Sequence, residues 1–243
     1  ENLVDTYFNY CNNGEYENAY NLITDECKKA YYPTLESFTG YVNYVFEGKK
    51  KIYNLQSYSV VDNTYIYNIR ILDDILANGT SDGYYYYEEK IVLKEENGEM
   101  KLAIGEFISQ DNPNISVEDE YMKIEIIERT VDYDTETYRI KVTNKTDDKY
   151  IILADGKQNN EVKLDLGTRK DDPDDAVTSL IINPNGFRFE EITFTKFYDN
   201  GKTSQGIYFG AVRILNSYNH SVGTTQEDLD NAVKLYSIEV PLN

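Results

Sequence analysis

The spacing of apolar residues changes at about residue 47, and this change limits the folds open to the chain. Up to Phe46, apolar residues recur at helical spacing. From Lys49 to Asn243 they recur mostly in short alternating runs, which Asn-Gly, Asp-Gly and Pro interrupt. A helical opening followed only by strands predicts an α+β domain with an all-β domain behind it. We therefore expect residues 1–112 and 113–243 to form two domains, joined in the polar segment 110–114.

The acidic composition disfavours some classes of partner. The 243 residues carry a net charge of −19, and 40 % of them are hydrophobic, which is enough to build real cores. Residues 1–118 contain 20 acidic and 9 basic residues, and the remainder is acidic as well. The only basic run, Lys49-Lys50-Lys51, is too short for a nucleic-acid reader. We therefore expect no nucleic-acid partner.

The sequence also offers no segment for crossing a membrane. No apolar run approaches the roughly 18 residues that a spanning helix requires, and an anionic membrane surface would repel both parts of the chain. The chain begins at Glu1 rather than Met. We therefore expect processing or trimming at this end, and membrane attachment only through an anchor absent from this sequence.

The two cysteines, Cys11 and Cys27, are expected to be buried free thiols. If Gly14 joins two helices and the second is unbroken through Cys27, that helix rises about 20 Å over its length. A disulfide needs Cα atoms within about 7 Å. A break near Thr24 would make a bridge possible.

Three helices are expected before residue 47. The first has Leu3, Val4, Tyr7, Phe8 and Cys11 on one face and ends at Gly14. The second repeats this face with Tyr16, Ala19, Tyr20, Ile23 and Cys27. The third follows Pro33 with Thr34 as its N-cap, and buries Leu35, Phe38, Val42, Val45 and Phe46.

Four strands are expected to complete the first domain. They are Ile52–Val61, Thr64–Leu76, Tyr84–Lys94 and Met100–Ile108, with turns at Asp62-Asn63 and Asn97-Gly98. This arrangement predicts three helices packed on a curved antiparallel sheet.

The remainder has about eight short alternating runs, which is typical of a β-sandwich. They are Tyr121–Glu128, Thr137–Thr143, Lys149–Leu153, Val162–Leu166, Val177–Ile182, Phe187–Phe197, Ile207–Leu215 and Lys234–Leu242. Turn signals are Asp155-Gly156, Pro184-Asn185-Gly186 and Asn200-Gly201. The segment 217–231 is expected to be a polar loop, with one helical turn near Thr225–Leu229.

The run Tyr7-Phe8-Asn9-Tyr10-Cys11-Asn12-Asn13-Gly14-Glu15-Tyr16-Glu17-Asn18-Ala19-Tyr20 resembles the opening helices of NTF2-like domains. Thr34-Leu35-Glu36-Ser37-Phe38 and the four-strand tail fit the same family, so the resemblance covers about residues 1–110. It implies a cone-shaped cavity between the third helix and the sheet. Relatives use such a cavity either for binding or for catalysis by an Asp or His base beside a Tyr or an acid donor. The second part resembles, by pattern alone, immunoglobulin-like sandwich modules of bacterial envelope proteins.

Few residues are candidates for chemistry in the first domain. Asp73 and Asp74 could share a pocket with Tyr41 or Tyr44, although strand-end acids in solvent are the simpler interpretation. The spacing of these residues singles out no catalytic residue.

The second domain likewise offers few candidates for catalysis or metal binding. The single histidine, His220, lies in a polar segment, and a surface role is expected for it. Asp171-Asp172-Pro173-Asp174-Asp175 could supply oxygens to calcium, but it lacks the spacing of an EF-hand loop. Asp132, Asp134 and Glu136 alternate as on one strand face. We predict solvated acids in both places, with no catalytic residue, no metal and no cofactor.

These observations predict a non-enzymatic, extracytoplasmic binding protein of a bacterial cell envelope. Its partner would be an unknown protein or small ligand, met by the Tyr-rich sheet, the cone cavity or the sandwich loops; the chain has 24 Tyr and no Trp. One alternative is a small-molecule enzyme of the NTF2-like kind with an Asp/Tyr pair. Another is a structural subunit of a secretion or conjugation assembly, which a filled cavity and a large exposed apolar patch would favour.

Overall fold

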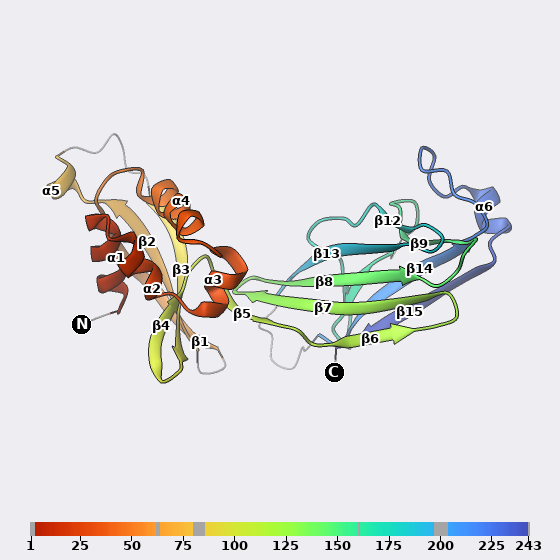
Figure 1. Ribbon diagram of the computed structural model, residues 1–243, viewed down its shortest axis with the longest axis horizontal. Coiled ribbons are helices and arrows are strands. Elements are labelled where there is room, and N and C mark those ends of the chain that lie inside the picture. The colour runs from red at the N-terminus through yellow and green to blue at the C-terminus, as the bar shows by residue number, and fades with distance from the viewer. Residues whose placement is uncertain (1–2, 62–63, 80–85, 160, 197–203, 243) are drawn as a thin grey trace. The chain divides into compact units, whose positions relative to one another are not determined.

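The computed structural model describes all residues except 1–2, 62–63, 80–85, 160, 197–203 and 243 (Figure 1). Two compact units divide the chain. The first comprises Glu1–Gln110 with Val131–Tyr133, and the second comprises Asp111–Thr130 with Asp134–Asn243. The short segment 131–133 thus belongs to the first unit, although its first two residues are the end of the strand Met122–Asp132. The turns expected at Asp62-Asn63 and Asn200-Gly201 lie outside the described residues.

The first unit contains helices on one four-stranded antiparallel sheet, with strand order β1-β2-β3-β4. Its elements are α1 (Leu3–Asn13), α2 (Tyr16–Asn21), α3 (Asp25–Tyr31), α4 (Leu35–Phe46), β1 (Lys51–Val61), β2 (Thr64–Asp73), α5 (Ile75–Asn78), β3 (Tyr86–Glu96) and β4 (Glu99–Ala103). Thr34 caps α4 with a capping box that includes Ser37. Asn97 and Gly98 both have positive φ at the β3–β4 turn, as the hairpin signal predicts.

The prediction of an α+β domain with three helices packed on a sheet is wrong. The described residues are mostly β, in three antiparallel sheets, and they form six helices, most of them short. The helix expected from Tyr16 through Cys27 is broken, because Ile23 pairs with Leu102 as an isolated parallel bridge. Thr24 then caps a separate helix by accepting a bond from Cys27 N at 3.2 Å. A tertiary contact thus replaces the local helical pattern.

The break near Thr24 does not lead to a disulfide. Cys11 and Cys27 are both buried free thiols, as the helical faces predict. Cys27 Sγ contacts Ile104 O at 3.6 Å, within the core of the first unit.

The second unit has two antiparallel sheets that share one core. The larger has the order β11-β10-β14-β9-β12, and β15 pairs with β14. The other has the order β13-β8-β7, and β6 pairs with β7. The strand β5 (Phe107–Asp111) belongs to the first unit except for Asp111. The strands and one helix of the second unit are β6 (Ile115–Glu118), β7 (Met122–Asp132), β8 (Thr135–Asn144), β9 (Tyr150–Ala154), β10 (Lys163–Asp165), β11 (Lys170–Asp171), β12 (Leu180–Ile182), β13 (Phe187–Thr195), β14 (Gly206–Leu215), α6 (Gln226–Asp230) and β15 (Lys234–Pro241).

Alternating side chains of these strands form the core. Met122, Ile124 and Ile126 of β7 are buried, as are Tyr138 and Ile140 of β8. The β-rich, sandwich-like arrangement agrees with the strand pattern, whereas the finer immunoglobulin-like assignment stays a prediction. None of the described helices is long and apolar enough to cross a bilayer.

Candidate functional site

Asp73, for which the sequence favours a solvated strand-end acid over a pocket shared with a Tyr, is held by two lysines. Its Oδ1 accepts a hydrogen bond from Lys51 Nζ at 2.6 Å, and its Oδ2 accepts one from Lys49 Nζ at 3.0 Å. The bonds from Lys51 and then Lys49 lower the pKa of Asp73. The carboxylate therefore stays ionised and tied to the strand end.

Asp74 and Tyr44 have equally structural roles. Asp74 is the N-cap of α5 and accepts a bond from Ala77 N at 3.1 Å. Tyr44 is 73 % exposed and meets the ring of Tyr87 edge-on, with 6.3 Å between centroids. The helix cap explains the position of Asp74, and the ring contact explains that of Tyr44.

An acid and a tyrosine do meet inside the first unit, but the acid is Glu89. Tyr41 Oη donates a 2.5 Å hydrogen bond to Glu89 Oε2, and Gly105 N donates to Oε1 at 3.0 Å. Glu89 is only 4 % exposed. Burial raises the pKa of Glu89, and the bonds from Tyr41 and Gly105 oppose this rise only in part. Both oxygens have donors, so the pair is a satisfied buried group.

Strand alternation places Glu89 in the core. Tyr87, Glu89 and Ile91 follow at period two, so they share the sheet face that the helices cover. Glu89 precedes Ile91 by two positions in the same strand, so the sequence already places this acid on the face of a core residue. Our prediction missed that signal. The two cavities described below include neither Glu89 nor Tyr41.

The environment of the two thiols disfavours the reactive thiolate form. Burial raises the pKa of Cys11 to about 12, and burial likewise raises the pKa of Cys27 to about 12. A nucleophilic cysteine needs the opposite shift, because the thiolate is the reactive form.

His220 is exposed on a loop of the second unit. Its ring lies edge-on to that of Tyr218, with 5.0 Å between centroids, and 6.5 Å from that of Tyr150. Aromatic contacts explain its position, as expected for a surface histidine.

The acidic run 171–175 is divided among separate partners. Asp172 forms an ion pair with Lys163, and Asp174 Oδ1 accepts a bond from Thr195 Oγ1 at 2.7 Å. In the part of the chain that the structure describes, no group of three or more His, Cys, Asp or Glu residues could hold a metal ion.

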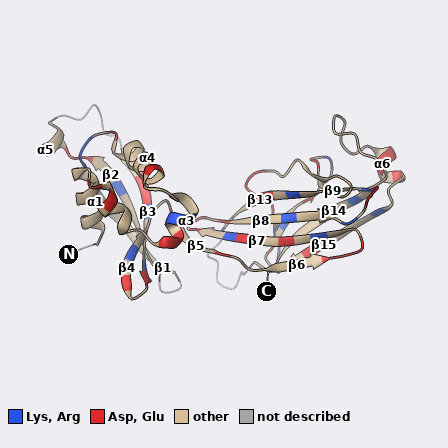
Figure 2. Ribbon diagram, viewed as in Figure 1, with Lys and Arg blue, Asp and Glu red and all other residues tan. Residues whose placement is uncertain are grey.

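The alternating acids Asp132, Asp134 and Glu136 are not one site. Asp132 belongs to the first unit and accepts a bond from Tyr31 Oη at 2.6 Å, whereas Glu136 belongs to the second and accepts one from Tyr138 Oη at 2.6 Å. Acidic residues occur on many elements of each unit (Figure 2). The carboxylates thus mostly bind neighbouring donors.

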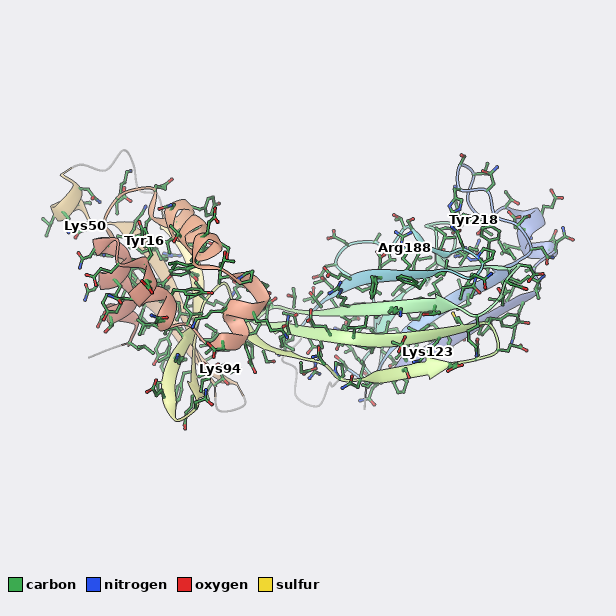
Figure 3. All side chains as sticks on the ribbon, in the orientation of Figure 1. Tyr16, Lys50, Lys94, Lys123, Arg188 and Tyr218 are labelled. Atoms are coloured by element: carbon green, nitrogen blue, oxygen red, sulfur yellow. The ribbon has the colours of Figure 1, made fainter. Side chains whose placement is uncertain are left out.

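A buried ion cluster, which the sequence patterns did not predict, lies in the second unit. Arg213 is 1 % exposed; its Nη1 lies 2.8 Å from Asp155 Oδ1, and its Nη2 lies 2.7 Å from Glu161 Oε1. Asp155 Oδ2 also accepts bonds from Thr224 and from Tyr218, which Figure 3 labels. Burial raises the pKa of Asp155, but the bonds from Thr224 and the charge of Arg213 outweigh it and lower this pKa. The cluster fixes two loops onto β14.

Two cavities flank this cluster. A groove of about 550 Å³ runs between the loops after β9 and β11, and it is lined by Gly156, Gln158, Asn159, Glu161, Val162, Lys163, Asp172, Pro173, Ala176, Val177 and Thr178. A smaller hollow of about 260 Å³ lies where β14 and β15 pair, and it is lined by Gln158, Gly210, Ala211, Val212, Arg213, Leu229, Leu235, Tyr236 and Ser237. We call the second one the bulge hollow.

Part of the helix-covered face of the first sheet is open. Five large apolar side chains there are about half or more exposed, and we call them the open face: Leu55, Tyr58, Val60, Tyr65 and Met100. The strand register places them on the same face as the core residues Ile69, Ile71 and Leu102. The buried core of the unit thus continues into an uncovered apolar surface.

No protein-family model matches this chain, and no curated protein matches it. The resemblances to NTF2-like and immunoglobulin-like domains therefore rest on the sequence patterns alone.

Proposed function

We propose that this chain is a non-enzymatic binding protein, and that its open face receives an amphipathic, basic helix of a protein partner. The observation that carries the proposal is the exposure of Tyr58, Val60 and Tyr65, which are 67 %, 53 % and 48 % exposed. Contiguous apolar surface of this kind is typical of interaction sites. Tyrosine suits such a site, because its ring supplies large contact area with few rotatable bonds.

Cross-strand pairing makes the open face continuous. Val60 pairs with Tyr65, and Tyr65 pairs with Leu93. Further along the same two strands, Tyr58 pairs with Tyr67, with 6.4 Å between the ring centroids. These rows form one apolar surface rather than scattered side chains.

The form of the partner follows from the strand edge beside this face. The register of β1 shifts between Leu55 and Ser57, which leaves Gln56 as an extra residue. A bulge of this kind disfavours the addition of another strand at a sheet edge. A helix laid across the face needs no pairing with that edge.

The charge of the partner follows from the borders of the face. Asp5 of α1 accepts a bond from Tyr53 Oη at 2.6 Å, next to Leu55 along β1. Glu95 pairs with Met100, so these two share a face. Carboxylates at both borders favour a partner with Lys or Arg flanking its apolar stripe.

Selection from a displayed library of random helical peptides tests this proposal on the full chain. We expect the selected peptides to be basic and amphipathic, and to lose about tenfold or more in affinity for the Tyr58→Ser/Tyr65→Ser variant. Tyr44→Ser is the matched control, because Tyr44 is exposed on α4 and outside the open face. Peptides that bind the double variant as tightly as the control, or that are mainly acidic, would contradict the proposal.

A second candidate, a structural subunit of a larger envelope assembly, is favoured by the filled core of the first unit. Rings of Tyr7, Tyr20, Tyr32 and Tyr41 lie among Phe38 and its neighbours at centroid distances of 5.1–6.4 Å. Isolated chain that self-associates through the open face in sedimentation experiments, and that stops doing so in Tyr58→Ser/Tyr65→Ser, would favour this candidate. A location outside the cytoplasm stays a prediction, which fractionation of cells can test.

A further inference from the structure

The strands β8 and β13 of the second unit share an outer face that differs in charge from the rest of the chain. Tyr138, Ile140 and Val142 of β8 are buried in the core, so the residues between them lie on the opposite face. The register of β8 with β13 extends this face over both strands. We call it the cationic face, and it consists of Thr135, Thr137, Arg139, Lys141, Thr143, Phe187, Phe189, Glu191, Thr193 and Thr195. It has two cations and one acid, in a chain with a net charge of −19 (Figure 2).

Two aromatic rings on this face are open to solvent. Phe187 and Phe189 are 61 % and 45 % exposed, and their ring centroids lie 5.7 Å apart. Adjacent exposed rings offer a partner a large contact area. None of the residues of the cationic face lines the groove or the bulge hollow, so this surface is a separate feature of the unit.

Each of the two rings has a cation from the neighbouring strand above it. Lys141 pairs with Phe189 in the register, but its Nζ lies over Phe187, 5.1 Å from the ring centroid. Arg139 pairs with Glu191, and its Cζ lies over Phe189 at 5.3 Å. The same diagonal contact thus repeats after two residues, which separates the two charges by about 7 Å along the strands.

Both cations can bind a further carboxylate. Arg139 Nε lies 3.9 Å from Glu191 Oε1, and the side chain of Glu191 is 69 % exposed. Such a loose, exposed pair contributes little stability, so a ligand can replace it. Lys141 has no ion-pair partner among the described residues, and its charge contacts only the ring of Phe187.

The spacing of the two charges selects the form of the ligand. Alternate side chains of an extended peptide point to the same side and repeat about every 7 Å, as the cations do. Residues two apart on a helix do not face the same way. An extended segment with an acid at every second position can therefore place one carboxylate on each cation.

A single-stranded nucleic acid would also bring negative charge, but two observations disfavour it. Such ligands stack their bases on open aromatic rings, whereas Arg139 and Lys141 already lie over these rings. The net charge of −19 also repels a long polyanion. A short acidic segment interacts chiefly with charges within a Debye length, about 8 Å at physiological ionic strength.

We propose that the cationic face binds an extended segment of a partner protein with acidic residues at every second position. Arg139 and Lys141 bind its carboxylates, and Phe187 and Phe189 supply the apolar contact. This site is in the second unit and is independent of the open face of the first, which would bind a basic helix.

Two octapeptides of the same composition test the proposal. One alternates Thr and Glu, and the other repeats Glu-Glu-Thr-Thr, so that no two of its acids are two positions apart. Each is titrated into the isotope-labelled full chain at physiological ionic strength, while the amide signals of Lys141, Phe187 and Phe189 are followed by NMR. We expect the alternating peptide to shift these signals and to bind about tenfold or more tightly than the other. Equal affinities, or no shift up to the solubility limit, would overturn the proposal.

Removal of the two charges provides the confirming variant. Arg139→Gln/Lys141→Gln should weaken binding of the alternating peptide about tenfold or more. Lys170→Gln/Lys234→Gln is the matched control, because it changes the net charge equally and both lysines also lie over tyrosine rings, on the other sheet. Equal affinity of the two double variants would contradict the site.

Other occupants of the face would give other results, and we expect neither of them. An eight-nucleotide oligothymidylate that shifts the same signals and binds more tightly than the alternating peptide would overturn the proposal in favour of a nucleic acid. Self-association of the free chain in sedimentation velocity that is lost in Phe187→Ser/Phe189→Ser would also overturn it, because the face would then join two copies of this chain.

Discussion

Tyr41 Oη donates a 2.5 Å hydrogen bond to Glu89 Oε2 in the core of the first unit. This bond and the one from Gly105 N give the carboxylate two donors, which is less than bulk water provides. Burial therefore raises the pKa of Glu89 above its ordinary value of 4.5. The stability of the first unit is thus linked to the protonation of one side chain.

The sign of this linkage predicts the pH dependence of Glu89→Gln. Between the unfolded and the raised folded pKa of Glu89, the folded state binds more protons, so stability falls as pH rises through that window. The substituted glutamine cannot ionise, and its amide can still meet Gly105 N and Tyr41 Oη. We therefore expect the free energy of unfolding of Glu89→Gln, relative to the parent, to rise with pH across this window.

Denaturant titrations at several pH values, from about 4 upward, measure this difference. Glu88→Gln is the matched control, because Glu88 is its exposed neighbour and pairs with Arg70 at 2.8 Å. A pH-independent difference for Glu89→Gln, or the same slope in the control, would show that Glu89 does not titrate in this range.

The thiols give a second prediction. Since burial raises the pKa of Cys11 and of Cys27 to about 12 each, almost no thiolate exists in the folded chain at neutral pH. We expect iodoacetamide to leave both thiols unmodified in the native chain, and to modify both once denaturant unfolds the first unit. Mass spectrometry counts the adducts. Rapid alkylation of either thiol before unfolding would contradict the burial.

Local signals in the sequence predict the short-range features of this fold. Thr34 caps its helix, Asn97-Gly98 closes its hairpin, and Thr225 starts the helical turn α6. Each depends on residues within a few positions of one another, where backbone preference and side-chain capping decide the outcome. Thr24 with Asp25 behind it was a signal of the same kind that our prediction used only as an alternative.

Long-range features could not be predicted in this way. The pairing of Ile23 with Leu102, which breaks the expected helix, joins segments far apart in sequence. The contact of Arg213 with Asp155 spans 58 positions, and a lone arginine in a strand is more typical of a surface residue. Glu89 lies between these cases, because its face follows from alternation but its partner Tyr41 is on a helix whose placement only the fold determines.

Arg213→Met tests the importance of the ion cluster. Removing the guanidinium leaves Asp155 and Glu161 buried without their counter-charge, and breaking a buried pair in this way costs roughly 3–5 kcal/mol. We expect a loss of this size in the unfolding free energy of the second unit, measured by denaturant titration. Arg188→Met is the control, because Arg188 is more exposed and pairs only loosely with Glu190, at 3.5 Å; it should change stability by less than about 0.5 kcal/mol. Equal losses in the two variants would contradict a special role for Arg213.

Deletion of Gln56 tests the bulge in β1. Leu55 pairs with Ile69 and Tyr58 pairs with Tyr67, so removing the one extra residue between them should restore a regular ladder without moving Tyr58 to the other face. The open face would remain, but β1 would present a straight, unprotected edge to other chains. We therefore expect the deletion variant to fold and to self-associate more strongly than the parent chain with rising concentration in sedimentation velocity. A replacement of Gln56 by Ser keeps the bulge and should behave as the parent does; a deletion variant that associates no more than this control would show that the bulge does not protect the edge.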